Sequence, residues 1–148
     1  MKKQIIILLS FFICLISYSQ KQLDSDQFYA DQTPMEIKLN YSNKDMKKKT
    51  NDSTYIKTDL EYNYQNEWKT IPVELRARGN FRRAKCYFPP IKMKMKKSNY
   101  KNTIFDGNKK TKLVLPCRVE DDKNDNILQE YIAYKIYEII SPYHFKTR

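Results

Sequence analysis

Short runs of alternating apolar and polar residues constrain the fold of this chain more than any other feature. Residues 91–96 alternate three apolar side chains with three lysines, and residues 35–41 alternate in the same way. Successive side chains of a strand point to opposite faces, so these runs are typical of half-buried strands. Further strands are expected at residues 55–64, 68–78 and 112–115, with a hairpin turn at 65–67. The pattern therefore predicts an antiparallel sheet with one wet face.

One strong helix is expected after these strands. Asn126 followed by Gln129 resembles a capping box, and Ser141-Pro142 ends the helix. We expect its apolar stripe to pack on the sheet through Leu128, Ile132, Ala133, Ile136, Ile139 and Ile140. Residues 42–53 fit either a solvated loop or a short helix, and residues 143–148 begin another alternating run. The predicted fold class is α+β, a curved antiparallel sheet of about five strands with one packed helix.

The first nineteen residues have the order of a signal peptide. Lys2 and Lys3 precede an apolar run at residues 5–16, and small residues follow at 17–19, which predicts cleavage before Gln20. The apolar run of about 12 residues is shorter than the roughly 20 that span a bilayer, so no stable membrane span is expected. We therefore expect export to the periplasm, cell surface or exterior, with residues 20–148 forming one region of domain size.

The small numbers of glycines, cysteines and histidines exclude two common kinds of binding site. Gly79 and Gly107 are the only glycines in the sequence, which excludes a glycine-rich phosphate loop. One histidine and the two cysteines after the leader, Cys86 and Cys117, do not make a standard zinc site, so no metal site is expected. Export would permit a disulfide between these cysteines, but spacing alone does not bring the sulfurs together. Two free, buried thiols are the favoured interpretation.

The positive charge is concentrated in one region. Residues 74–112 contain 13 basic and 2 acidic residues, in a chain whose net charge is +11. Such a local field attracts phosphate or other polyanions. Lys92 and Lys94, on one face of a strand, could hold such a ligand, or they could form only the wet side or protected edge of a sheet. Residues 78–80 could equally be a simple turn, with Gly79 at positive φ and Asn80 bonding its own backbone.

Several short motifs resemble the N-terminal part of the spore coat protein H (CotH) kinase family. They are Arg-Gly-Asn at residues 78–80, the lysine-bearing strand that follows, Leu-Val-Leu at 113–115, and the helix containing Ala-Tyr at 133–134. The resemblance covers about residues 74–148. It implies an atypical, secreted, kinase-like fold in which ATP, with Mg²⁺, lies beneath the N-terminal sheet.

The resemblance also implies a set of nucleotide-binding residues. Arg78 and Asn80 match the family motif, Lys94 falls on the strand lysine, and Lys92 stands for a family arginine. Phe81 replaces the family's serine, and Arg82 and Arg83 are nearby cations that could supply the missing charge. Glu130 is the helix carboxylate positioned to orient the lysine. Its alternative is solvent exposure near the start of the helix, where the macrodipole favours a carboxylate.

The family's catalytic and metal-binding aspartates lie in a later lobe, and no Asp-Phe-Asp-like motif occurs here. No catalytic residue is therefore assigned. We expect a truncated, nucleotide-facing fragment of a secreted CotH-like kinase, inactive without its missing C-terminal lobe. The alternative is an exported binding module for anionic ligands such as polysaccharide or lipid phosphate. The tyrosines and lysines fit nucleic-acid binding in composition, but export argues against nucleic acid as a partner.

Overall fold

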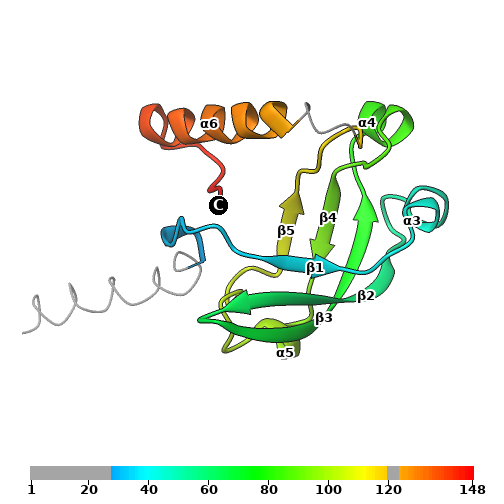
Figure 1. The fold of residues 1–148 in the computed structure, drawn as a ribbon, viewed down its shortest axis with the longest axis horizontal. Helices are drawn as coiled ribbons and strands as arrows, with labels where there is room; N and C mark the ends of the chain where they lie inside the picture. Colours follow the sequence, from blue (N-terminus) through cyan, green and yellow to red (C-terminus); the bar gives the residue numbers. More distant parts are fainter. Residues whose placement is uncertain (1–27, 120–123) are drawn as a thin grey trace, which may run out of the picture.

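The computed structural model describes residues 28–119 and 124–148, so the predicted signal peptide lies outside the described residues. Five strands form one open antiparallel sheet in the order β1-β2-β3-β4-β5 (Figure 1). They are β1 (Ile37–Leu39), β2 (Ile56–Tyr64), β3 (Glu67–Ala77), β4 (Ile91–Lys94) and β5 (Lys110–Leu113). Helices within the described residues include α3 (Asn43–Lys49), α4 (Asn80–Lys85), α5 (Lys97–Tyr100) and α6 (Asn124–Ile140). The α+β class and the five-stranded antiparallel sheet are confirmed.

The hairpin between β2 and β3 forms as predicted. Tyr64 pairs with Glu67, which leaves Gln65 and Asn66 as a two-residue loop. Both loop residues have positive φ, 56° and 64°, as a type I′ turn requires. The twist of this turn matches that of the strands and fixes the register of the longest strand pair. By contrast, β5 begins two residues earlier than predicted, because Lys110 already pairs with Lys94.

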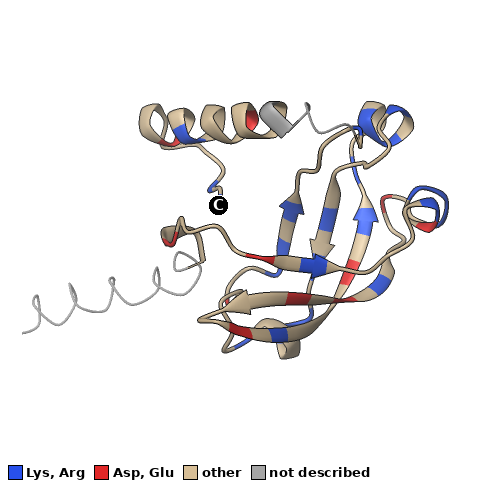
Figure 2. Ribbon diagram, viewed as in Figure 1, with Lys and Arg blue, Asp and Glu red and all other residues tan. Residues whose placement is uncertain are grey.

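The core lies on one face of the sheet. Alternate residues of the central strands, including Leu75 in β3 and Ile91 and Met93 in β4, are fully or almost fully buried. Their neighbours along the strands, which include Arg76, Lys92 and Lys94, point to the other face. Figure 2 marks the charged positions along these strands. The predicted separation of an apolar face from a lysine face is therefore present in β4.

Helix α3 resolves the alternative left open for residues 42–53. Ser42 caps it by accepting a hydrogen bond from Asp45 N at 3.2 Å, and Met46 is fully buried against the core. Thr50, just after the helix, accepts a hydrogen bond from Ala77 N at 3.1 Å. Part of this polar segment is thus a short helix packed against β2 and β3.

The prediction that one apolar stripe of α6 packs on the sheet is wrong. Its residues are exposed: Leu128, Ile132, Ala133, Ile136, Ile139 and Ile140. Ile127, Glu130, Tyr131 and Tyr134 instead line a cavity that faces the sheet, and α6 stands apart from the strands (Figure 1). Because α6 is apolar or aromatic on two sides, its periodicity did not determine which side faces inward.

Residues 143–148 form no strand, which corrects the prediction of another alternating strand. They fold back along α6, where Glu138 accepts hydrogen bonds from Thr147 N at 2.9 Å and Thr147 Oγ1 at 3.1 Å. Desolvation opposes ionisation of Glu138, but hydrogen bonds from Lys135 and Thr147 hold its pKa below the ordinary value. Arg148 then pairs with Asp31 at 3.0 Å, which joins this segment to the start of the described chain.

No helix in the described part of the chain is both long enough and apolar enough to cross a bilayer.

Candidate ligand-binding site

A cavity of about 1060 Å³ lies between the core face of the sheet and α6. Its walls come from β1, β2, β4, β5, α6 and residues 145–148. Aromatic rings contribute much of the lining: Phe28, Tyr29, Tyr41, Phe88, Phe105, Tyr131, Tyr134 and Phe145. The volume is slightly above the usual range for small-molecule sites, about 300–1,000 Å³. The cavity is therefore large enough for a ligand with a planar ring and a charged group.

The charged residues that line the cavity are mostly basic. The basic ones are Arg78, Lys110, Lys112, Arg118, Lys146 and Arg148. Among the described lining residues, Glu130 is the one carboxylate. An excess of one charge sign in a low-dielectric concavity concentrates ions of the other sign. The cavity is thus suited to an anion.

Arg78 is the basic group in this wall best placed to bind a ligand. Its backbone N–H donates to Pro90 O at 2.9 Å, and Gly79, at φ 77°, then turns the chain from β3 into α4. The side chain is half-buried and makes no hydrogen bond, ion pair or ring contact with any described residue. Arg148, in contrast, is already paired with Asp31. A half-buried guanidinium with its donors unused is a ready partner for a phosphate or carboxylate.

The predicted turn at residues 78–80 is only partly correct. Gly79 has the positive φ that was expected. Asn80, however, is the first residue of α4 and is exposed, so the segment leads into a helix. Asn80 is not among the residues that line the cavity.

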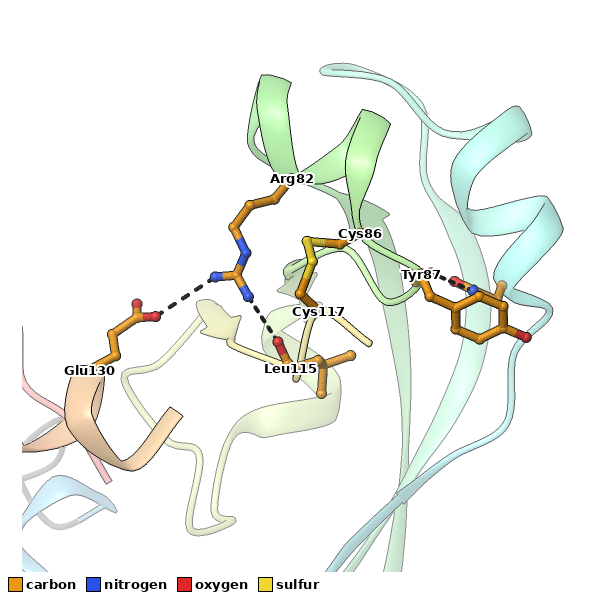
Figure 3. Close-up of a disulfide and its surroundings, with 7 residues drawn as sticks. Arg82, Cys86, Tyr87, Leu115, Cys117 and Glu130 are labelled. Atoms are coloured by element: carbon orange, nitrogen blue, oxygen red, sulfur yellow. Dashed lines mark hydrogen bonds and ion pairs between the residues drawn. A yellow bond between two sulfur atoms is a disulfide. The ribbon is translucent and has the colours of Figure 1, made fainter. Parts of the chain in front are cut away.

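Arg82 and Glu130 meet at the end of the cavity (Figure 3). Arg82 donates from Nη2 to Leu115 O at 2.9 Å, and its Nη1 lies 3.7 Å from Glu130 Oε2. Both side chains are about one-third exposed, so the ion pair contributes at most about 1 kcal/mol to stability. The structure thus holds Glu130 against an α4 arginine, not against the strand lysine that the kinase resemblance implied.

A disulfide between Cys86 and Cys117 ties the end of α4 to the segment after β5 (Figure 3). The two Cα atoms are 4.6 Å apart, and Tyr87 N donates to Cys117 O at 2.7 Å beside the bond. The interpretation of two free thiols is therefore wrong. Sequence spacing could not reveal this contact, because it depends on the β3-α4-β4 connection and the end of β5 meeting at one side of the sheet.

Arg83 has a different partner from Arg82. Its guanidinium donates to Thr50 O and to Lys47 O, the latter at 3.4 Å, at the carboxyl end of α3. Basic side chains satisfy the otherwise unpaired carbonyls of a helix end in this way. Arg83 therefore joins α4 to α3 and is not a lining residue of the cavity.

Lys92 and Lys94 lie on the opposite face of the sheet from the cavity. Their neighbours Ile91 and Met93 point into the core, so strand alternation turns both lysines outward. Lys94 pairs with Glu74 at 3.1 Å. The predicted site residues thus form two groups, one with Arg78, Arg82 and Glu130 near the cavity and one with Lys92 and Lys94 behind it.

Sequence reasoning missed most of the aromatic wall. Phe28, Tyr41 and Phe105 lie outside the strands at positions far apart in the chain, and the fold brings all three to the lining of one cavity. The one available signal was the high aromatic content of 14%. Tyr131 and Tyr134 were in the predicted helix but on the side not assigned to packing.

Within residues 28–119 and 124–148, no three His, Cys, Asp or Glu side chains group closely enough to hold a metal ion. No protein-family model, curated protein or solved structure matches this chain. The resemblance to the CotH kinases therefore rests on the short motifs described above.

Proposed function

We propose that this protein binds a nucleotide in the cavity between the sheet and α6, as the N-terminal, nucleotide-facing part of a secreted CotH-like kinase. The observation that carries the proposal is Arg78, a half-buried arginine without a partner among the described residues, on the wall of an aromatic-lined cavity. The resemblance to the CotH kinase family, which implies ATP beneath the N-terminal sheet, supports the same location. The proposal concerns binding, and it assigns no catalytic residue.

The cavity chemistry matches the two parts of a nucleotide. A triphosphate carries about four negative charges and is held mainly by basic side chains, backbone amides and Mg²⁺. Arg78, on the wall of this cavity, offers a planar, bidentate donor to such a group. The tyrosine and phenylalanine rings offer flat apolar surfaces for a base.

Arg82 and Glu130 act on this site indirectly. Their ion pair, with the bond from Arg82 to Leu115 O, links α4, the segment after β5 and α6 across the end of the cavity. The disulfide reinforces the same junction. These contacts fix the distance between α6 and the sheet, which keeps the binding space open. Magnesium would arrive with the nucleotide phosphates, as is usual for this ion.

Export remains part of the proposal. The lysine, apolar and small-residue order of residues 1–19 supports it, and the Cys86–Cys117 disulfide agrees with an oxidising compartment. N-terminal sequencing of exported material should begin within a residue or two of Gln20. Recovery of the protein only in the cytoplasm, with Met1 intact, would contradict export.

Titration calorimetry of the full chain with ATP and Mg²⁺ tests the proposal. The wild type should bind, and Arg78→Gln should weaken binding about tenfold or more, since a charge-assisted hydrogen bond contributes roughly 1.5–3 kcal/mol. Arg78→Lys keeps the charge but loses the bidentate geometry, so its affinity should fall between the two. Lys92→Gln, on the other face, is the matched control and should bind like the wild type. Absence of ATP binding, or equal loss in the control, would refute the cavity as a nucleotide site.

A second candidate function is the binding of an anionic polymer. It is favoured by the basic residues that lie in register on the outer face of the sheet.

A further inference from the structure

The outer face of the sheet carries an ordered set of cations. Two of them, Lys110 and Lys112 on the edge strand β5, also border the cavity, whereas Lys92 and Lys94 do not. Strand register puts Arg76, Lys92 and Lys112 directly opposite one another on β3, β4 and β5. Neighbouring strands lie about 4.8 Å apart, so these three positions form a row about 10 Å long. Tyr55, whose hydroxyl lies 3.2 Å from Arg76 Nε, continues the row.

A second row runs parallel to the first. Lys57, Glu74, Lys94 and Lys110 are directly opposite one another on β2, β3, β4 and β5. Together the two rows place six basic residues, one carboxylate and one phenol on the outer face. Arg76 pairs with Asp52 at 2.6 Å and Lys94 with Glu74 at 3.1 Å, and Asp59 and Glu61 of β2 lie on the same face outside the two rows. We call these eight residues the outer cation grid. They are Tyr55, Lys57, Glu74, Arg76, Lys92, Lys94, Lys110 and Lys112.

Lys92 is at the centre of the first row and has no ion pair, hydrogen bond or ring contact with any described residue. Its two cross-strand neighbours are both cations; Arg76 is paired with Asp52, and Lys112 Nζ lies 4.2 Å from the centre of the Phe145 ring, so neither supplies negative charge to Lys92. Like charges directly opposite one another in a sheet are destabilising. Arrangements that lower stability without a local structural gain are expected mainly at functional sites. The grid therefore indicates a ligand that supplies the missing negative charge.

The grid also limits what that ligand is. Its one ring, Tyr55, is already in contact with Arg76 at its hydroxyl and with Lys94, whose Nζ lies 5.3 Å from the ring centre. No ring in the grid is thus open for stacking with bases, which single-stranded nucleic acids use. The grid also has no aliphatic or unoccupied aromatic side chain to insert into a bilayer. The grid therefore offers a ligand only a flat array of charged groups.

We propose that the outer cation grid binds an extended, carboxylated polysaccharide, with Lys92 as its central contact. An acidic glycan presents carboxylates at intervals of about one sugar ring along a stiff chain, which matches cations held at strand spacing. Lys92 and its neighbours replace their mutual repulsion with charge-assisted hydrogen bonds to these carboxylates. The central contacts of this site, Lys92 and Lys94, face away from the nucleotide cavity, and the grid borders the cavity only at Lys110 and Lys112.

The test uses the full chain and polygalacturonate, with neutral dextran as the uncharged comparison. The wild type should bind polygalacturonate and not dextran, and the affinity should fall with added salt because exposed charges are screened. Lys92→Glu should weaken binding about tenfold. Lys69→Glu makes the same charge change at the hairpin end of β3, outside the grid, and should stay within about twofold of the wild type.

A thermal melt separates a binding role from a structural one. Because Lys92→Glu puts a carboxylate between two cations, it should keep or raise the melting temperature, by up to a few degrees. A clear drop in melting temperature together with lost binding would show that Lys92 is structural and would overturn the inference. Unchanged polygalacturonate binding in Lys92→Glu would overturn it as well.

Binding of other polyanions tests whether the ligand is a polysaccharide. Single-stranded and duplex oligonucleotides, and vesicles of phosphatidylcholine and phosphatidylglycerol in equal parts, should bind more weakly than polygalacturonate. Equal or tighter binding of any of these would replace the polysaccharide with that class of ligand. Arg78→Gln should bind polygalacturonate normally, even if the cavity proves not to bind ATP.

Discussion

The two faces of the sheet use positive charge in different ways. On the inner face, apolar side chains surround a cavity, and Arg78 is a half-buried cation on its wall. On the outer face, Lys92 is one of a row of cations in register on three strands. The inner arrangement suits a small ligand with an apolar part, and the outer one suits a long polyanion. The basic residues that are concentrated in this part of the sequence therefore belong to two surfaces, one on each face of the sheet.

Strand alternation produces this separation. In β4, Ile91 and Met93 enter the core while Lys92 and Lys94 point outward. A shift of one residue in register would exchange the two sets, so the pairing of β4 with β3 and β5 fixes both surfaces at once.

Removal of the disulfide should give the largest loss of stability, and this loss should affect the inner face of the sheet. Replacing Cys86 and Cys117 by serine should lower the free energy of unfolding by about 3–4 kcal/mol, because the bond closes a loop with a sequence separation of 31 residues. Denaturant unfolding measures this loss. Below the melting temperature, polygalacturonate binding should persist while the junction of α4 with the segment after β5 loosens. An unchanged unfolding free energy would contradict a constraining role for the bond.

Truncation of the core comes next. Leu75→Ala should lower the free energy of unfolding by about 3 kcal/mol, since Leu75 is fully buried between neighbouring strands. Ile136→Ala is the matched control, because Ile136 on α6 is 54% exposed and should cost less than about 1 kcal/mol. The two costs, measured by urea unfolding, compare a packed strand with the outward side of α6. Equal costs would mean that α6 buries that side in solution.

Acid should release residues 143–148, which form one wall of the cavity. Hydrogen bonds from Thr33, together with Arg148, hold the pKa of Asp31 below its ordinary value. Hydrogen bonds from Lys135 and Thr147 likewise hold the pKa of Glu138 below its ordinary value, despite desolvation, which acts to raise it. Carboxylates with lowered pKa values stabilise the fold at neutral pH, and this contribution is lost as the pH falls below about 4.

The amide resonance of Thr147, followed by NMR, should therefore titrate with a midpoint below that of an ordinary glutamate. Glu138→Gln should abolish the titration while Lys92→Gln leaves it unchanged. A midpoint above about 4.3 would contradict the contacts that bind Glu138 to Thr147.

The sequence predicted the sheet better than it predicted the site. Alternation located the strands, and the polar turn at residues 65–67 marked the hairpin, because both signals are local. Helix α6 was located, but its two apolar sides were equivalent at the level of periodicity, so the inward side was misassigned. The Cys86–Cys117 bond and the aromatic wall could not be predicted from the sequence, since each depends on where segments far apart in the chain meet.

The site residues show the same limit. Lys92 and Arg78 were both recognised as candidate anion contacts, from their charge and neighbouring motifs. The sequence assigned them to one site, because they are 14 positions apart in one basic region. The chain reverses between them through α4 and returns as β4, which puts their side chains on opposite faces of the sheet.

The central claim is that the two faces bind separate anions, and a crossed titration tests it most directly. ATP with Mg²⁺ and polygalacturonate are each titrated into the wild type, Arg78→Gln and Lys92→Glu under the same buffer and salt. Arg78→Gln should lose ATP affinity alone, and Lys92→Glu should lose polygalacturonate affinity alone, each by about tenfold. If either substitution weakens the binding of both ligands equally, the basic residues form a single site and the account is wrong.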